Sequence, residues 1–320
     1  MGMMQPNKSM DPVVVREPDA SKGARPVLRG EGCREVPFLP TCMLCSAKST
    51  FATGRRGFLL AAAAAATVPV ATPAGAQVDV GKASGVRKLV PEKELEQAAH
   101  QQYAQMMGEA RAKGLLVGEG DAQLRQLRAI AQRTIPFAAN WNDGIKNWRW
   151  EVNLIRSKQI NAFCMPGGKI AFYTGILDQL KLSTDEAAMI MGHEMAHALR
   201  EHARERLAKS ELTNLGLRLG AQLFGLGQMG DLAAGLGTQL LTLKYSRDDE
   251  TEADLVGLEL AARAGYQPNA SVSLWKKMAS AGGSGGPGFL STHPSGPDRI
   301  AVLEANVPKV MGLYDRARRR

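Results

Sequence analysis

Apolar and polar positions along the chain follow two periods, one typical of helices and one typical of strands. Residues 91–132 carry apolar side chains at helical spacing, with a break near Gly114–Gly120. Residues 148–156 alternate instead, as in a strand with one buried face. Two short apolar runs then flank Pro166–Gly168, and this arrangement predicts a β-hairpin. The alternating apolar positions of the first strand are Trp148, Trp150, Val152 and Leu154.

Helices are predicted for most of the second half of the chain. A capping box at Ser183–Glu186 opens a helix that runs toward Arg206. Further helices are expected over residues 248–264 and from about Pro297. The apolar, glycine-rich residues 211–243 favour a mobile lid or a pair of surface helices. The pattern therefore predicts a single α+β domain that is mainly helical and contains a small β-sheet or hairpin.

The residues before this domain resemble an export leader rather than a folded element. Residues 53–76 combine the pair Arg55–Arg56, an apolar stretch of 13 residues over Phe58–Val70, and a small-residue cleavage site at Ala74–Ala76. A bilayer span needs about 20 apolar residues, so a permanent membrane helix is not expected. The arginine pair predicts a twin-arginine-like signal, with a Sec signal as the alternative. Cleavage near Ala76 would release the protein into the periplasm.

Charge changes this picture little. The chain has 320 residues and a formal charge of +9, of which +4 falls in residues 1–76 and four further charges in arginines of residues 316–320. Residues 1–52, rich in proline, glycine and charge, are expected to be disordered or a mis-annotated extension. The folded part, residues 77–320, is otherwise close to neutral, so nucleic acid is not an expected partner. Peripheral association with the envelope membrane stays open, as does the oligomeric state.

Catalytic chemistry is indicated by an HExxH motif on the capped helix. His193 and His197 lie four residues apart, so both imidazoles project from one helix face and can reach one metal ion. Glu194, next to the first histidine, can take a proton from a metal-activated water. This arrangement is typical of zinc peptidases, which need a third protein ligand. Ala203 occupies the position where metzincins carry a third histidine, and the neighbouring His202 points away from the metal face.

A carboxylate on the following helix can supply the third ligand. Glu250 can bind the metal, and Asp254, one turn later, can accept a hydrogen bond from a ligand imidazole and so fix its tautomer. Glu252 is the alternative ligand, although its spacing from Asp254 does not place both on one helix face.

Together these blocks resemble the HtpX/BepA/LoiP-type gluzincin zinc endopeptidases, which are related to the CAAX prenyl proteases. The resemblance covers about residues 145–305 and implies a zincin-type metallopeptidase domain. It implies that His193, His197 and Glu250 bind one Zn²⁺, that Glu194 is the general base, and that Asp254 supports a ligand from behind. The matching blocks are Asn161–Phe163, Pro166–Gly168, Thr174–Gly175, His193–His197 with His202, Ser246–Arg247, Glu250 with Ala253–Asp254, Gly265–Tyr266 with Pro268, Thr292–Pro294 and Asp298–Ile300.

The resemblance also implies a substrate-binding strand and two further catalytic candidates. An edge strand over Asn161–Ala171 would bind the substrate backbone, which holds a peptide whatever its side chains. His293 would lie near the metal, where it fills the open coordination position at rest or steadies the oxyanion; a plain loop histidine is the alternative. Arg299 either neutralises the oxyanion or pairs with an acidic neighbour. The substrate-binding candidates are Asn161, Ala162, Phe163, Gly167 and Gly168.

The sequence therefore predicts a zinc-dependent endopeptidase. Family resemblance suggests misfolded or unassembled cell-envelope proteins as its substrates. One alternative is a zinc-binding periplasmic chaperone or assembly factor with latent proteolysis. Another is a binder of nucleic acid or membrane surfaces that acts through the C-terminal arginines.

Overall fold

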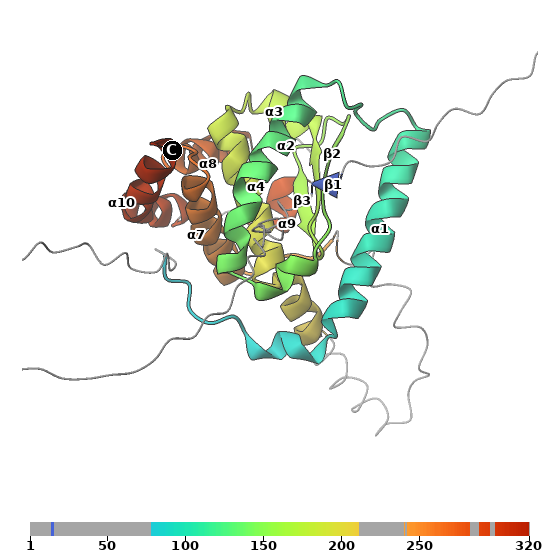
Figure 1. The fold of residues 1–320 in the computed structure, drawn as a ribbon, viewed down its shortest axis with the longest axis horizontal. Helices are drawn as coiled ribbons and strands as arrows, with labels where there is room; N and C mark the ends of the chain where they lie inside the picture. The colour runs from blue at the N-terminus through green and yellow to red at the C-terminus, as the bar shows by residue number, and fades with distance from the viewer. Residues whose placement is uncertain are drawn as a thin grey trace, which may run out of the picture. The chain divides into compact units, whose positions relative to one another are not determined.

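Helix α4 (Thr184–Leu199) lies at the centre of the fold and is buried along most of its length. The computed structural model of the protein describes residues 14–15, 78–210, 240, 242–281, 288–294 and 298–319. In Figure 1, α7, α8 and α10 lie on one side of α4, and the β-sheet lies on the other. The bounds of the other helices are η1 (Gly85–Leu89), α1 (Glu92–Ala112), α2 (Ala122–Thr134), η2 (Ile135–Asn140), η3 (Asp143–Asn147), α3 (Thr174–Gln179), α7 (Arg247–Arg263), α8 (Ala270–Ala281), α9 (Phe289–Thr292) and α10 (Arg299–Arg318).

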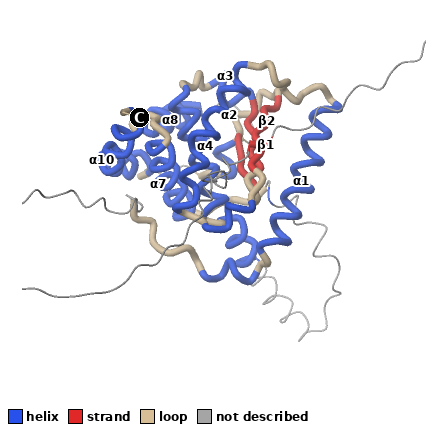
Figure 2. Tube along the Cα trace, viewed as in Figure 1, coloured by secondary structure: helices blue, strands red, loops and turns tan. Residues whose placement is uncertain are grey.

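The β-sheet has the strand order β1-β2-β4-β3, and its central pair, β2 with β4, is parallel. Helices α2 and α4 contact one part of this sheet and α1 packs against β3 and β4, so the strands lie between helices (Figure 2). Strand β3 is at the edge. The fold is thus a mainly helical α+β domain with a small sheet, as predicted. The strands are β1 (Val14–Val15), β2 (Trp150–Ile155), β3 (Ala162–Met165) and β4 (Lys169–Tyr173).

The predicted hairpin is confirmed by the antiparallel pairing of β3 with β4. Its turn contains Gly167 and Gly168, whose φ angles of 81° and 77° lie in the region that glycine adopts at little cost. A Cβ at Gly168 would also lie 2.8 Å from the indole of Trp150 on β2. Both glycines therefore have a structural reason to be present in this turn.

The helix that begins at the predicted capping box ends earlier than predicted. Ser183 Oγ accepts from the backbone N–H of Glu186, and the Glu186 carboxylate accepts from the N–H of Ser183, so the box is formed. The helix ends at Leu199 instead of continuing toward Arg206. Glu201 has a φ of 59°, which breaks the helical path, and residues 202–210 start a new helical segment. The predicted break near residues 114–120 does separate α1 from α2.

Several predictions fall on residues outside the described part. The leader at residues 53–76 and most of the glycine-rich stretch 211–243 are not described, and of residues 1–52 only β1 is. The proposed domain boundaries therefore stay predictions. Among the helices of the described ranges, none has both the length and the apolar character needed to cross a bilayer.

Candidate active site

Helix α4 carries three buried polar side chains of the HExxH motif into the interior of the protein. His193, Glu194 and His197 are each at most 4% exposed. The Nε2 atoms of the two histidines lie 3.1 Å apart, as expected for imidazoles one turn apart on one helix face. A helix buried on all sides can hold such polar groups only where other polar groups meet them.

Helix α7 supplies the carboxylate that meets these two histidines. Its capping box, formed by Ser246 and Asp249, fixes the start of the helix at Arg247. In the first turn, Glu250 lies with Oε1 3.4 Å from His197 Nε2 and Oε2 3.6 Å from His193 Nε2. The residue that competes with it in the sequence, Glu252, points elsewhere and contacts Arg200 and His202.

The segment after α9 adds a fourth group. His293 Nδ1 lies 3.0 Å from Glu250 Oε1 and 3.3 Å from His193 Nε2. One potential ligand atom from each of His193, His197, Glu250 and His293 lies within 4.8 Å of the other three, and all four residues are buried. The glycine-rich stretch before His293 is only partly described, but His293 itself is held at this cluster.

A carboxylate behind His193 fixes how that imidazole is protonated. His193 Nδ1 lies 3.0 Å from Asp254 Oδ1, and because an ionised carboxylate can only accept, we assign the proton to Nδ1. The lone pair of Nε2 then faces the cluster. Burial alone would raise the pKa of Asp254, but Arg299 and the hydrogen bond from His193 outweigh it and lower that pKa.

Arg299 pairs with acidic neighbours, which is one of the two arrangements expected from the sequence. Its guanidinium donates to both carboxylate oxygens of Asp254, at 2.7 and 2.8 Å, and lies 2.7 Å from Glu250 Oε2. The same group stacks 3.4 Å from the ring centroid of Trp275. Arg299 is therefore a buried counter-charge for two carboxylates; its predicted role at an oxyanion remains a prediction.

The protonation states favour a cation at the cluster. Burial holds the pKa of His197 well below its ordinary value, so its imidazole is neutral. Burial opposes ionisation of Glu250, but the neighbouring His197 and His293 imidazoles lower the pKa of this carboxyl far below its usual range. Two imidazoles and one ionised carboxylate form a donor set that suits zinc. The predicted ligand residues therefore fit a Zn²⁺ ion.

Glu194 lies beside this donor set, and one of its carboxylate oxygens accepts no hydrogen bond from the described residues. Its Oε1 is buried without a hydrogen-bond partner among the described residues and lies 3.6 Å from His293 Nε2. Burial raises the pKa of Glu194, which brings it toward the range of a general base. An orphaned buried carboxylate oxygen is costly unless a water or substrate atom meets it.

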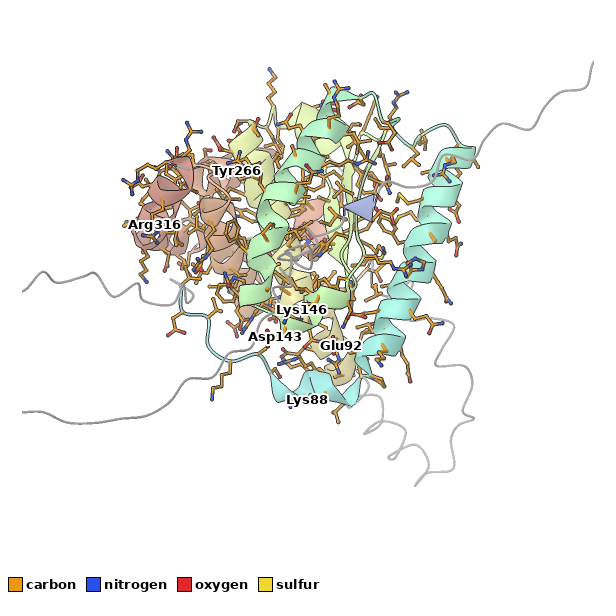
Figure 3. All side chains as sticks on the ribbon, viewed as in Figure 1. Lys88, Glu92, Asp143, Lys146, Tyr266 and Arg316 are labelled. Atoms are coloured by element: carbon orange, nitrogen blue, oxygen red, sulfur yellow. The ribbon has the colours of Figure 1, made fainter. Side chains whose placement is uncertain are left out.

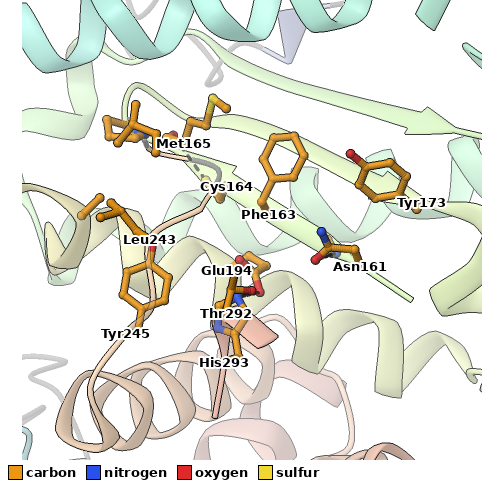
Figure 4. A pocket seen from close by; sticks show the side chains of 14 residues that line it. Asn161, Phe163, Cys164, Met165, Tyr173, Glu194, Leu243, Tyr245, Thr292 and His293 are labelled. Carbon is orange, nitrogen blue, oxygen red and sulfur yellow. Dashed lines mark hydrogen bonds and ion pairs between the residues drawn. The ribbon is translucent and has the colours of Figure 1, made fainter. Parts of the chain in front are cut away.

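A pocket of about 160 Å³ opens onto Glu194 and His293. Figure 4 shows Asn161 and Phe163 on one side of it and Leu243 on the other. Three of the predicted substrate-binding residues line it, whereas Gly167 and Gly168 do not. The described lining residues are Asn161, Ala162, Phe163, Cys164, Met165, Pro166, Tyr173, Glu194, Ala203, Leu240, Leu243, Tyr245, Thr292 and His293.

Two side chains at the site are not among the predicted site residues. Tyr245 stacks on His197 with ring centroids 3.9 Å apart, and its position directly before the α7 cap is the signal that could have indicated it. His202 contacts the outer nitrogen of His197, Nδ1, at 3.0 Å. That contact could not be predicted from a continuous helix, because it depends on the turn at Glu201.

Comparison with known proteins agrees with this geometry. The profile described as Peptidase family M48 matches residues 121–307. The mitochondrial metalloendopeptidase OMA1 of Arabidopsis thaliana is 39% identical over 159 residues, covering 49% of this chain and 32% of that protein. The protein of the same name from Schizosaccharomyces pombe is 37% identical over 169 residues, covering 52% of this chain and 49% of that protein. Metalloprotease LoiP of Escherichia coli is 26% identical over 173 residues, covering 53% of this chain and 67% of that protein. The match thus spans half or less of the two mitochondrial proteins.

Proposed function

Since the chain belongs to peptidase family M48, whose enzymes use zinc, we propose that it is a zinc-dependent endopeptidase. The observation that carries this proposal is the convergence of His193, His197 and Glu250 beside Glu194, whose Oε1 has no hydrogen-bond partner among the described residues. The first three residues would hold Zn²⁺, and Asp254 would orient His193. A buried donor set next to a carboxylate oxygen without a hydrogen bond is what a metal-assisted hydrolase requires.

The zinc ion, when bound, supplies Lewis acidity toward a water molecule and the scissile carbonyl. Glu194 accepts the proton of the attacking water at its carboxylate and then delivers it to the leaving amine. Its raised pKa suits both roles, since the group must gain and lose a proton in one cycle. Asp254 keeps the proton of His193 on Nδ1, and Arg299 keeps Asp254 ionised.

Substrate would bind along β3. This strand pairs with β4 on one side and stands at the end of the strand order. Its residues Ala162 and Phe163, with the preceding Asn161, line the pocket that contains Glu194. An extended peptide added to such an edge is held by its main chain, which suits substrates of varied sequence.

Misfolded or unassembled cell-envelope proteins are the substrate class that we propose, with the periplasm as the location. Support comes from the export signal expected at residues 53–76 and from backbone recognition at β3. Some relatives are named mitochondrial, so membership of the family does not by itself fix the compartment.

A zinc-binding chaperone or assembly factor with latent proteolysis is the second candidate. It is favoured by one observation, the position of His293 within the donor set. A fourth protein ligand would fill the coordination position that catalytic zinc sites leave open.

Glu194→Gln tests the proposed function. We expect this variant to retain zinc, because Glu194 is not in the donor set, and to lose casein digestion by about 10²–10⁴-fold. Glu94→Gln makes the same chemical change on the exposed face of α1 and is the matched control. Near-normal digestion by Glu194→Gln would rule out the assignment. Zinc content is measured on the same preparations, so loss of metal is distinguished from loss of the base.

A further inference from the structure

The outer side of His197, away from the metal cluster, is occupied by a second histidine. His202 Nδ1 lies 3.0 Å from His197 Nδ1, with the two rings in an edge-to-face arrangement at 5.0 Å between centroids. His202 is 2% exposed. The left-handed turn at Glu201 interrupts the helix after α4, and His202 lies against His197 in the last turn of that helix.

The far nitrogen of His202 meets a carboxylate of α7. His202 Nε2 lies 3.3 Å from Glu252 Oε2, and Arg200 Nε donates to the same oxygen at 2.8 Å. Arg200 is itself tied to the main chain, since its Nη2 donates to the carbonyl of Gly81 at 3.1 Å. Glu252 Oε2 therefore lies between Arg200, which can only donate, and His202.

The order of these groups determines where each proton lies. A carboxylate only accepts, so Nε2 of His202 carries the hydrogen that faces Glu252. With that hydrogen on Nε2, the Nδ1 atom of His202 is placed to accept from Nδ1–H of His197. The lone pair of His197 is left on Nε2, the atom that faces Glu250 and His193.

We propose that Glu252 and His202 form a positioning pair that holds His197 in the tautomer and orientation required for binding zinc. Asp254 fixes the tautomer and orientation of His193 by direct contact with its Nδ1 atom. Glu252 and Asp254 are two residues apart on α7, so they leave the helix in different directions and serve different imidazoles. This inference rests on the proposed zinc site, and it assigns roles to two residues that are neither ligand nor base.

Zinc affinity of the full chain tests the pair. The purified protein is stripped of metal and titrated with Zn²⁺ in competition with a chromophoric chelator. His202→Leu removes the acceptor for His197 Nδ1–H, and we expect it to weaken zinc binding by about 10–100-fold. His202→Asn can place an amide oxygen where Nδ1 was, so we expect its affinity to lie closer to that of the parent.

Variants of α7 extend the test. Glu252→Ala frees His202 to take either tautomer. We expect its zinc affinity to lie between that of the parent and that of His202→Leu. Asp248→Ala removes an exposed carboxylate from the first turn of the same helix and is the matched control. If Glu252→Ala lost zinc as completely as Glu250→Ala, Glu252 would be a ligand and the pair would be overturned.

Unfolding temperatures of the metal-free variants separate positioning from packing. We expect the metal-free His202→Leu and His202→Asn variants to unfold at similar temperatures while differing from each other in zinc affinity. His202→Leu binding zinc as tightly as the parent, or His202→Asn binding it as weakly as His202→Leu, would overturn the proposal. These results are independent of the Glu194→Gln experiment, which can fail while the positioning pair stands.

Discussion

Gly192 of α4 and Gly257 of α7 are in backbone contact. A Cβ at Gly192 would lie 2.6 Å from the carbonyl oxygen of Gly257, and a Cβ at Gly257 would lie 2.6 Å from the amide nitrogen of His193. The two helices therefore pack with no side chain between them directly beside the HExxH motif. This close approach brings Glu250 and Asp254, which precede Gly257 on α7, within reach of His193.

Gly257→Ala should push the two helices apart at this point. Overpacking of a close contact costs about 1–3 kcal/mol, so we expect the free energy of unfolding to fall by that amount. Zinc affinity should fall as well, because Glu250 moves with α7. Chemical denaturation and zinc titration measure the two effects.

Gly108→Ala is the control for this substitution. Gly108 lies within α1, and a Cβ there would meet nothing within 4 Å. We expect this variant to be more stable than the parent by up to about 1 kcal/mol. Equal stability of Gly257→Ala and Gly108→Ala would contradict the close packing of α4 and α7.

Arg299→Met should destabilise the protein strongly. The change leaves Asp254 and Glu250 as buried carboxylates without their shared counter-charge. We expect the free energy of unfolding to fall by about 3–5 kcal/mol. The same change at Arg316, an exposed residue of α10 labelled in Figure 3, should have little effect. Unfolding temperatures of the metal-free variants measure both, and similar values for the two would argue against the buried ion pair.

Glu186→Gln should reduce stability at neutral pH but not in acid. Burial alone would raise the pKa of Glu186, yet hydrogen bonds from Lys277, Ser183 N–H and Ser273 lower it below the ordinary value of 4.5. A lowered folded-state pKa contributes stability above the unfolded-state pKa, and that stability is lost as the pH falls through the folded-state value. At pH 7 we expect the free energy of unfolding of Glu186→Gln to lie about 1 kcal/mol below that of the parent.

The pH dependence itself is the measurement for Glu186. Unfolding of parent and Glu186→Gln is compared from pH 7 downward, and the difference should shrink once the pH is below the lowered pKa of Glu186. Glu94→Gln, on the exposed face of α1, should track the parent throughout. A deficit that stayed constant with pH would show that the carboxylate charge does not matter.

His293→Ala should leave zinc bound and raise casein digestion. Three donors remain in His193, His197 and Glu250, while the group 3.0 Å from Glu250 is removed and a coordination position becomes free. His100→Ala, on the exposed face of α1, is the control. Reduced digestion with unchanged zinc content would instead favour a role for His293 in steadying the oxyanion.

Local signals in the sequence predicted most of the elements. The spacing of His193 and His197, the capping box at Ser183 and the turn at Gly167–Gly168 each involve neighbours within a few residues, and local sterics and hydrogen bonds decide them. The helix end at Leu199 was predicted wrongly, because Glu201 adopts a left-handed conformation that few sequence signals anticipate.

Residue spacing alone predicts the residue types of a metal site, the helices that carry them and a preference for Glu250 over Glu252. The packing of α7 against α4 is what brings Glu250 to both histidines and Glu252 to Arg200 and His202. Both carboxylates lie on one helix, and what separates them is the orientation of α7 against α4. That orientation is set by contacts between residues far apart in the chain, which no local pattern records.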